Sequence, residues 1–400
     1  MKRLIYIFAM ILVAAGCAGI REYNPYKEGI YTLTVTTVWP EGDIARSGAE
    51  VRVEDINTGS RYVSQTDIDG TSKFSLPNGL YRINLSGKTE KEVFNASADK
   101  VVLSRQDRSV SLNVTVSKAG SIIIKEIYCG GCKKFPQEGD YQADQYVILH
   151  NNDFRVQYLD GICFGTLSPY NATGSNPWIG QNGLPEFVPI IQAVWQFPGN
   201  GENFPLQPGE DAVLCLRGAI DHTAQYPLSV NLNKEDYFVC YNPTYFTNTV
   251  YHPAPGNLIS QDRYLDVVIK TGQANAYTMS NASPAVVIFR AEGTTVQEFV
   301  QNSNNVIQVP GSSVDKVVKV PFDWVLDAVE IFDGRSTENQ KRLVPALDAG
   351  YATLTDVFLS HTLIRMVDEA ATSAAGYEIL ADTNNSLNDF YESEKQSLHE

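Results

Sequence analysis

Apolar and polar residues alternate along two segments that bracket the first folded region of the chain. In residues 31–39 the order Tyr-Thr-Leu-Thr-Val-Thr-Thr-Val-Trp places Leu33 and Val35 on one side and threonines largely on the other. Residues 109–116 alternate in the same way, with Val or Leu at every second position. A period of two predicts strands with one buried face, and the Asn, Asp, Gly and Pro residues between such segments predict turns. We therefore expect an antiparallel β-sandwich over residues 29–118.

A near-continuous apolar run marks the start of a second core. Residues 121–128 read Ser-Ile-Ile-Ile-Lys-Glu-Ile-Tyr, and such a run predicts a strand that other elements cover on both faces. Residues 314–320 and 328–332 are also predicted to be extended, whereas the charged tail at 391–400 is predicted to be frayed. The expected fold class is therefore all-β, with a second and larger sandwich over residues 119–390 that contains long insertions.

The order of segments in the first region resembles a known accessory module. Gly48–Asp55 is followed by Asn57-Thr-Gly, then by Thr66–Gly70 and by Leu76–Tyr81. This order is similar to the carboxypeptidase-regulatory-like, transthyretin-type β-sandwich. The resemblance implies a non-catalytic module of a kind that is frequent on outer-membrane receptors and surface proteins.

The second region resembles the lamin-tail-like domain, an immunoglobulin-type sandwich that also occurs in bacterial secreted proteins. The segments that carry this resemblance are residues 144–152, 158–161, 195–199 with 205–209, 325–330, and 382–386 with 389–390. Taken together, the two regions and the N-terminal segment resemble an uncharacterised family of lipoproteins from Bacteroidales. That resemblance implies no catalytic residues. Because such families are often encoded beside TonB-dependent receptors, it also implies a part in nutrient uptake.

Cys17 stands where a bacterial lipoprotein precursor is cut and acylated. A positive start, an apolar stretch over residues 4–13 and small residues before the cysteine predict a lipoprotein signal peptide over residues 1–16. Residues 17–28 would form a tether to the outer membrane, because each buried methylene of an acyl chain contributes about 0.8 kcal/mol. Only one acid, Glu22, follows closely, so the surface and periplasmic faces of that membrane both stay open.

The charge of the chain narrows the classes of partner. The 400 residues include 46 acidic and 31 basic side chains, which gives a formal net charge of −15. Such a charge repels nucleic acid and anionic lipid surfaces. We therefore expect no nucleic acid partner, and contact with a membrane only through the lipid anchor.

Cys129-Gly-Gly-Cys132 has a spacing that serves redox enzymes and zinc sites alike. A redox motif needs a following helix to lower the pKa of its first thiol, but residues 133–139 read as a loop. A zinc site needs two more soft ligands nearby, and the sequence offers no second cysteine pair. The pair is therefore predicted to form a local disulfide or to remain as two thiols in a glycine-rich loop.

The remaining candidate chemistry is sparse. The five histidines lie far apart, and none is spaced with another as metal ligands on one element are. No nucleophile motif appears around the serines. We therefore expect no catalytic residue, no metal and no cofactor, and we predict that the chain is not an enzyme.

Aromatic residues gather in a long insertion rich in Gly, Pro and Asn, residues 164–204. Long loops on a rigid sandwich are common binding surfaces, which makes Tyr170, Trp178 and Trp195 candidates for ligand contacts. Large rings are also commonly buried, so a satellite core beneath the insertion is the alternative.

Three hypotheses for the function follow. The first is a non-catalytic cell-envelope lipoprotein that binds a ligand or receptor as an accessory of a TonB-dependent uptake system. The second is a structural or adhesive surface protein, and the third, with the least support, is a hydrolase with an unrecognised site. Sequence alone does not identify the ligand.

Overall fold

The structure is a computed structural model that describes residues 29–40, 47–88, 92–181 and 183–399. Strands make up 40% of the described residues and helices 6%, so the predicted all-β sandwich class is confirmed. The signal peptide predicted at residues 1–16, Cys17 and the tether to residue 28 lie outside the described residues.

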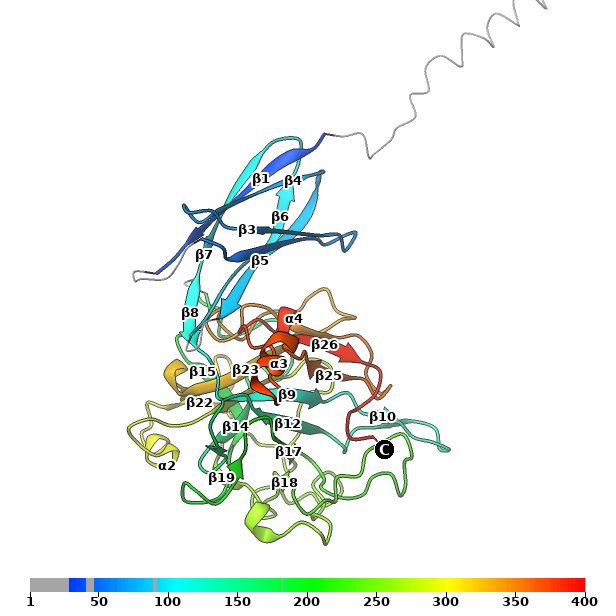
Figure 1. Cartoon of the computed structure of the whole chain (residues 1–400). Helices are drawn as coiled ribbons and strands as arrows, with labels where there is room; N and C mark the ends of the chain where they lie inside the picture. The colour runs from blue at the N-terminus through cyan, green and yellow to red at the C-terminus, as the bar shows by residue number, and fades with distance from the viewer. Residues whose placement is uncertain (1–28, 41–46, 89–91, 182, 400) are drawn as a thin grey trace, which may run out of the picture. The chain divides into compact units, whose positions relative to one another are not determined.

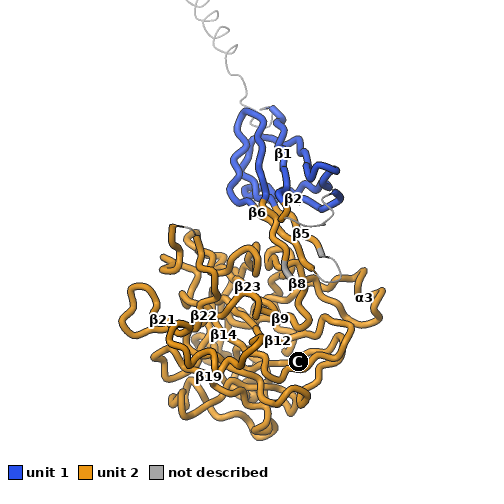
Figure 2. The backbone as a smooth tube through the Cα atoms, turned by 90° about the vertical axis from the view of Figure 1, so that its left-hand side faces the viewer, with its two compact units in different colours: residues 1–38, 45–83, 98–112 blue, residues 39–44, 84–97, 113–400 orange. Residues whose placement is uncertain are grey.

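Contacts divide the chain into two compact units (Figure 2). Unit 1 holds the described residues within 1–38, 45–83 and 98–112, and unit 2 holds those within 39–44, 84–97 and 113–400. The alternating strands predicted near the N-terminus supply unit 1, and the long apolar run begins the main body of unit 2.

Eight strands between residues 31 and 118 form two sheets, with the orders β4-β1-β7 and β3-β2-β5-β6-β8. Burial alternates along β1, where Leu33 and Val35 are fully buried, and along β2, where Val51 and Val53 are. One apolar face per strand is what sheets packed face to face require. The strands are β1 Tyr31–Val38, β2 Glu50–Asp55, β3 Arg61–Gln65, β4 Thr71–Leu76, β5 Gly79–Lys88, β6 Glu92–Leu103, β7 Arg108–Asn113 and β8 Thr115–Lys118.

The segment predicted as one strand at 109–116 is two strands in the structure. β7 ends at Asn113 and belongs to the three-stranded sheet, whereas β8 begins at Thr115 and belongs to the five-stranded sheet. Val114, between them, is 7% exposed. Apolar residues stay at every second position through the change of sheet, so the sequence pattern did not reveal it.

Two larger sheets form the body of unit 2 (Figure 1). One has the order β18-β17-β12-β9-β25-β26, and the other has the path β21-β22-β15-β14-β20-β23-β24 with β19 added beside β15. Their strands are β9 Ile122–Tyr128, β12 Tyr146–Asn151, β14 Cys163–Leu167, β15 Val188–Gln196, β17 Asp211–Cys215, β18 Phe238–Val239, β19 Asp266–Lys270, β20 Ala285–Phe289, β21 Val306–Gln308, β22 Lys316–Val320, β23 Val325–Asp333, β24 Ala352–Leu354, β25 Thr362–Arg365 and β26 Phe390–Ser393.

Short elements complete the body. Two small two-stranded sheets pair β10 with β11 and β13 with β16, and the described helices span seven residues at most. These elements are β10 Cys132–Lys133, β11 Asp140–Tyr141, β13 Gln157–Tyr158, β16 Pro205–Leu206, η2 Gln261–Arg263, α2 Val296–Phe299, η3 Phe322–Trp324, α3 Glu369–Ala375 and α4 Ser386–Asp389.

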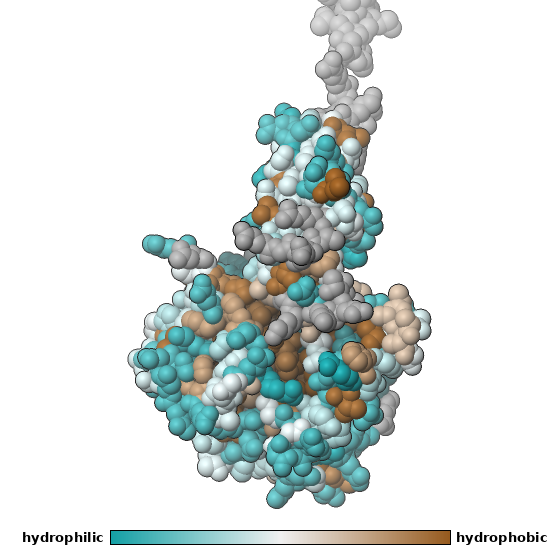
Figure 3. Space-filling view, turned by 60° about the vertical axis from the view of Figure 1, so that its left-hand side comes forward, coloured by the Kyte–Doolittle hydropathy of each residue, from teal (hydrophilic) through white to brown (hydrophobic). Residues whose placement is uncertain are grey.

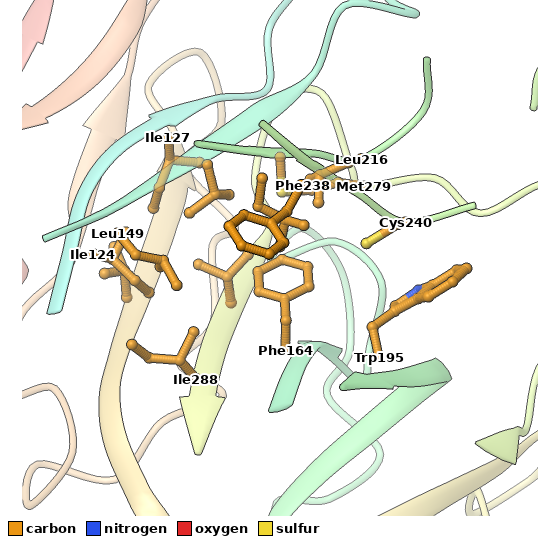
Figure 4. Packing of buried hydrophobic residues seen from close by; sticks show 14 of the residues in the cluster. Ile124, Ile127, Leu149, Phe164, Trp195, Leu216, Phe238, Cys240, Met279 and Ile288 are labelled. Carbon is orange, nitrogen blue, oxygen red and sulfur yellow. The ribbon is translucent and has the colours of Figure 1, made fainter. Parts of the chain in front are cut away.

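The main core draws on both large sheets. Ile124 of β9 and Leu149 of β12 come from one sheet, and Phe164 of β14 and Ile288 of β20 come from the other. Figure 4 shows these side chains together with Phe238 and Trp195 in one packed cluster. Burial of this apolar surface is the main stabilising contribution to the sandwich, at roughly 25 cal/mol per Å².

The outer faces of both sheets are covered as well. Tyr146 and Val213 pack on the outer side of the six-stranded sheet against Val230 and Ile259, which lie in the insertion that follows β17. A third cluster, which includes Cys163, covers the outer side of the other sheet. The prediction that residues 121–128 form a strand buried on both faces is therefore confirmed by β9, whose residues are buried except Lys125.

The end of the chain differs from the frayed tail predicted at 391–400. Residues 390–393 form β26, which pairs antiparallel with β25. Gln396 is 2% exposed, and the backbone N–H of Ser397 donates to Oε1 of Glu126 at 3.2 Å. Glu126 is itself fully buried and needs donors, so the polar residues of this segment serve a buried carboxylate instead of fraying into water.

The surface of unit 2 is mixed. On the face shown in Figure 3, hydrophilic side chains cover most of the larger unit, and smaller hydrophobic areas lie between them. Among the residues that the structure describes, no helix has both the length and the apolar character that a membrane crossing requires.

Candidate functional site

Trp195, predicted as a possible ligand contact, is a core residue. Its side chain is fully buried, stacks on Phe246 with ring centroids 5.5 Å apart, and meets the edge of Tyr277 at 5.3 Å. The prediction is corrected for this ring, which fills a core position on β15. Trp195 belongs to the main core between the two large sheets, and not to the separate satellite core that was the alternative.

Trp178 and Tyr170 are both half-buried. The Trp178 indole N–H donates to Oγ of Ser168 at 3.1 Å, and its ring lies edge-on to Phe187 at 5.7 Å. The hydroxyl of Tyr170 is 3.1 Å from Oγ1 of Thr278, and Tyr170 lines a pocket to which Trp178 does not contribute. The structure therefore does not join the two rings into one surface, and only Tyr170 leads to a candidate site.

Of the two alternatives predicted for Cys129 and Cys132, a local disulfide or two thiols, the structure has the two thiols. Both residues are free thiols and are almost completely buried. Burial raises the pKa of each thiol to about 12, and the nearby Asp144 carboxyl adds to the rise at Cys132. Because the thiolate is the reactive form, neither sulfur has the character of a redox or nucleophilic cysteine.

His150, Asp211 and Glu378 bring ligand-type atoms within 4.8 Å of one another. A cation already lies among them, because Nζ of Lys125 is 2.7 Å from Asp211 and 2.5 Å from Glu378. Both ring nitrogens of His150 face oxygen acceptors, one on Asp211 and one the Glu378 carbonyl. Burial alone would raise the pKa of Asp211, but bonds from His150 and Lys125 lower it. We interpret the cluster as a structural ion-pair network.

A pocket of about 350 Å³ opens beside Tyr170. Arg217, two residues after β17, lines it with Tyr251 and with the segment 274–281. The guanidinium carbon of Arg217 lies 5.7 Å from the centre of the Tyr251 ring, which is within the range of a cation–π contact. Among the described residues that line the pocket, Arg217 is the only one with a charged side chain.

Arg217 is unusual because its side chain is buried and makes few hydrogen bonds. It is 4% exposed, and its Nε has no hydrogen-bond partner among the described residues. Nη1 donates to the Gln142 carbonyl oxygen at 2.9 Å. A guanidinium has five N–H donors, so most of its capacity is unused by the described part of the protein.

The electrostatic surroundings leave this charge without a direct counterion. Burial lowers the pKa of the Arg217 guanidinium, while Tyr170 and the Asp144 carboxyl raise it through space. Oδ2 of Asp144 accepts hydrogen bonds from the hydroxyls of Ser229 and Tyr128, whereas its Oδ1 has no partner among the described residues. Burial also raises the pKa of Asp144, which favours its neutral form. Among the described residues, no carboxylate forms an ion pair with Arg217.

Two buried glutamines hold the segment 274–281 that lines the pocket. Gln145 donates from Nε2 to the carbonyl oxygens of Cys129 (2.8 Å) and Met279 (3.0 Å), and its Oε1 accepts from the Met279 N–H at 3.3 Å. Gln192 of β15 makes a similar pair with the backbone of Thr278, at 2.7 and 3.4 Å. The segment 274–281 has no strand of its own, so side-chain amides replace a strand partner there.

We expect replacement of Gln145 by leucine to lower the free energy of unfolding by about 2–4 kcal/mol, because three buried backbone groups lose their partner. Chemical denaturation of the purified protein measures this change. The exposed Gln273 immediately precedes the segment 274–281, and its replacement by leucine should change stability by no more than about 0.5 kcal/mol. Equal effects of the two substitutions would contradict the assigned role of Gln145.

The side chains that line this pocket are suited to binding a ligand. The pocket combines one guanidinium, the amides of Gln142, Asn275 and Asn281, and aromatic hydroxyls, which are groups that recognise a polar molecule with a negative charge. Sequence reasoning did not identify Arg217. The only signal was an arginine directly after the apolar run Val213–Leu216 and before a glycine, and that pattern is common without a function.

The comparisons with known proteins agree with this architecture. Residues 207–397 match a family model described as "Protein of unknown function (DUF4876)". A crystal structure of a DUF4876 family protein from Bacteroides thetaiotaomicron is similar, with a TM-score of 0.60, 27% identity, and coverage of 90% of this chain and 94% of that one. A shaft pilin from Lactobacillus rhamnosus GG gives a TM-score of 0.14 at 6% identity, over 73% of this chain and 97% of that one, which carries no argument. No curated protein matches.

The resemblance to an uncharacterised family is thereby supported at the level of a family of unknown function. The similar structure extends beyond the residues of the family match, because it covers 90% of the chain. Neither comparison carries an activity, a ligand or a partner to this chain. The site itself has to support the functional argument.

Proposed function

We propose that this chain is a lipid-anchored, non-catalytic binding protein of the cell envelope that holds a small polar ligand in the Arg217 pocket. One observation carries the binding role, namely a guanidinium that is 4% exposed, unpaired with any described carboxylate, and positioned at the wall of a pocket of about 350 Å³. A buried charge without a partner lowers stability, so its presence is best explained by a ligand that completes it.

The proposal of a non-catalytic role rests on the chemistry of the same pocket. The described residues that line it include no histidine, cysteine or carboxylate, which are the commonest general acids, bases and nucleophiles. The buried thiols of Cys129 and Cys132 are held in their unreactive protonated form. The guanidinium, amides and hydroxyls that line the pocket therefore suit ligand recognition better than bond cleavage.

The proposed location rests on Cys17 and its upstream sequence. An anchored binding protein with a regulatory-like sandwich and a lamin-tail-like domain is suited to a role as accessory of a TonB-dependent outer-membrane receptor. In that role, the Arg217 pocket would hold the ligand near the receptor at the outer membrane.

Replacement of Cys17 by alanine is expected to abolish incorporation of labelled palmitate and to reduce the membrane-bound fraction about tenfold or more, because acyl chains supply the attachment. Metabolic labelling and fractionation of the native host measure both effects. The adjacent Ala18→Ser substitution is the control and should leave labelling intact.

The proposed receptor partner can be tested in the same cells. Affinity purification of the lipidated full chain after cross-linking should recover a TonB-dependent receptor. Unchanged membrane attachment of Cys17→Ala would contradict the anchor. Repeated purification without a receptor would contradict the uptake role and favour a structural or adhesive one.

A further inference from the structure

We infer that the ligand of the Arg217 pocket is a carboxylated sugar, with its carboxylate on the Arg217 guanidinium and its ring beside Tyr251. This inference rests on the binding role proposed above and adds the chemical class of the ligand. Four features of the pocket carry it: the number of charges, the geometry of the free donors, the polar wall and the aromatic face.

The charge of the pocket matches a monoanion. Among the described lining residues Arg217 provides the only positive charge, and neither a lysine nor a second arginine lines the pocket. A phosphate group carries about −1.5 to −2 charges near neutral pH and would remain partly uncompensated here. A carboxylate carries one charge, which one guanidinium neutralises.

The free donors of Arg217 suit the shape of a carboxylate. Nη1 is used by the Gln142 carbonyl oxygen, whereas Nε has no partner in the described part of the chain. The guanidinium N–H groups lie in one plane and pair with the two oxygens of a carboxylate in a bidentate arrangement. Nε itself is buried, so a carboxylate would meet the guanidinium at the edge that lines the pocket and would neutralise a charge that no described carboxylate pairs with.

The rest of the wall suits hydroxyl groups. Gln142, Asn275 and Asn281 contribute amides and Thr278 a hydroxyl, so donors and acceptors stand side by side around the pocket. A sugar presents the same mixture, because each of its hydroxyls both donates and accepts. Some of these groups already pair with one another, since Asn281 Nδ2 donates to Gln142 Oε1 at 3.2 Å and the hydroxyls of Tyr170 and Thr278 lie 3.1 Å apart. A fatty acid would satisfy none of the remaining capacity, which costs affinity.

Tyr251 supplies the remaining contact. It is 52% exposed at the rim of the pocket, with its ring 5.7 Å from the guanidinium carbon of Arg217. Because the guanidinium lies over one face of the ring, the C–H groups of a sugar ring would contact the exposed remainder of it, while its hydroxyl remains polar. A volume of about 350 Å³ lies in the range of small-molecule sites.

The melting temperature of an Arg217 variant distinguishes a binding role of this residue from a structural one. A structural arginine stabilises the protein, so its removal lowers the melting temperature. Arg217 is buried with one hydrogen bond and no ion pair to the described residues, so Arg217→Met should leave the melting temperature unchanged or raise it. Functional sites commonly show this opposition between stability and activity.

The test is isothermal titration of the purified full-length protein with D-glucuronate, with glucose as the neutral match and inorganic phosphate as the dianion. D-glucuronate should bind at least about tenfold more tightly than either control, and Arg217→Met should weaken it roughly 10- to 100-fold. Arg217→Lys, which keeps the charge but loses the planar fork, should weaken it to an intermediate degree. The exposed Arg155, outside the pocket, gives the matched control Arg155→Met, which should bind as the wild type does.

Several results would overturn the inference. Absence of D-glucuronate binding, equal affinity for glucose, or tighter binding of phosphate would each exclude a carboxylated sugar. Unchanged affinity in Arg217→Met would exclude this pocket. If Arg217→Met failed to fold, Arg217 would have a stabilising role. Binding at this pocket would then be tested with Tyr251→Ala at the exposed rim, which has to weaken D-glucuronate binding; unchanged binding would exclude the pocket. Loss of the receptor partner with intact D-glucuronate binding would refute only the uptake role.

Discussion

Replacement of Arg342 by methionine is expected to lower the free energy of unfolding by about 3–5 kcal/mol, which is the cost of leaving a buried ion without its partner. Glu330 on β23 is fully buried and Arg342 is 3% exposed, and the two side chains approach to 2.6 Å. Without Arg342, the Glu330 carboxylate would remain in the core without its counterion.

Arg342 also joins segments that lie far apart in the chain. Its Nη1 donates to the Pro169 carbonyl oxygen at 3.1 Å, and Nη2 donates to that of Ser283 at 2.9 Å. Pro169 precedes Tyr170, and Ser283 follows the segment 274–281 that walls the pocket. The substitution should therefore loosen the pocket as well as the core.

Denaturant unfolding measures this effect, and two variants control it. Arg335 is exposed and pairs with Asp333 at 2.9 Å, so Arg335→Met should cost at most about 1 kcal/mol. The double variant Glu330→Leu with Arg342→Met removes both charges and should be less damaging than Arg342→Met alone. If Arg342→Met and Arg335→Met had equal costs, the proposed role of the buried pair would be wrong.

Replacement of Arg365 by methionine is the second substitution with a large expected effect. Arg365 on β25 is 2% exposed and faces three buried carboxylates: Asp327 at 2.5 Å, and Asp382 and Asp389 at 3.4 Å each. Its Nε also donates to the Ile124 carbonyl oxygen at 2.7 Å. Loss of the one cation among three acids should cost at least about 3–5 kcal/mol near pH 8.

The cost should depend on pH because the carboxyl groups can take up protons. Burial, opposed by the attraction of Arg365, raises the pKa of Asp389 to about 7 and that of Asp327 to about 6. At pH 5 both groups are largely protonated and need the cation less. Arg365→Met should therefore destabilise the protein less at pH 5 than at pH 8, and denaturation at the two pH values measures the difference.

The same shift has a signature in the wild type. A raised pKa in the folded state stabilises the protein below the unfolded value, near 4 for aspartate, and this contribution is lost as pH rises through about 7. The full contribution of Asp389 is up to about 4 kcal/mol. Asp389→Asn removes the titration, so the stability difference between wild type and variant should change between pH 4 and 7. A constant difference would contradict the raised pKa.

The parts of the fold that follow from local pattern were predictable. Residues 121–128 carry enough consecutive apolar side chains to require cover on both faces, and β9 has that cover. The change of sheet at Val114 was not predictable, because a strand that crosses between two sheets keeps the same alternation. The tail was misjudged because its role depends on Glu126, a buried acid some 270 residues earlier in the chain.

The candidate site was harder to predict from the sequence than the fold. An aromatic residue in a glycine-rich insertion has the same local sequence whether it is displayed or buried, and Trp195 is buried. Arg217 became a candidate only once the fold placed it beside Tyr170 and the segment 274–281 without a described carboxylate partner. The absence of a partner is a property of three-dimensional packing, which one sequence does not contain.

The most direct test of the central claim, that the Arg217 pocket binds an acidic ligand, is a crystal structure of the full-length protein with D-glucuronate. We expect the carboxylate of the ligand within hydrogen-bond distance of the Arg217 guanidinium, and the sugar ring beside Tyr251. A pocket that stays empty at saturating D-glucuronate, or a carboxylate that points away from Arg217, would contradict it.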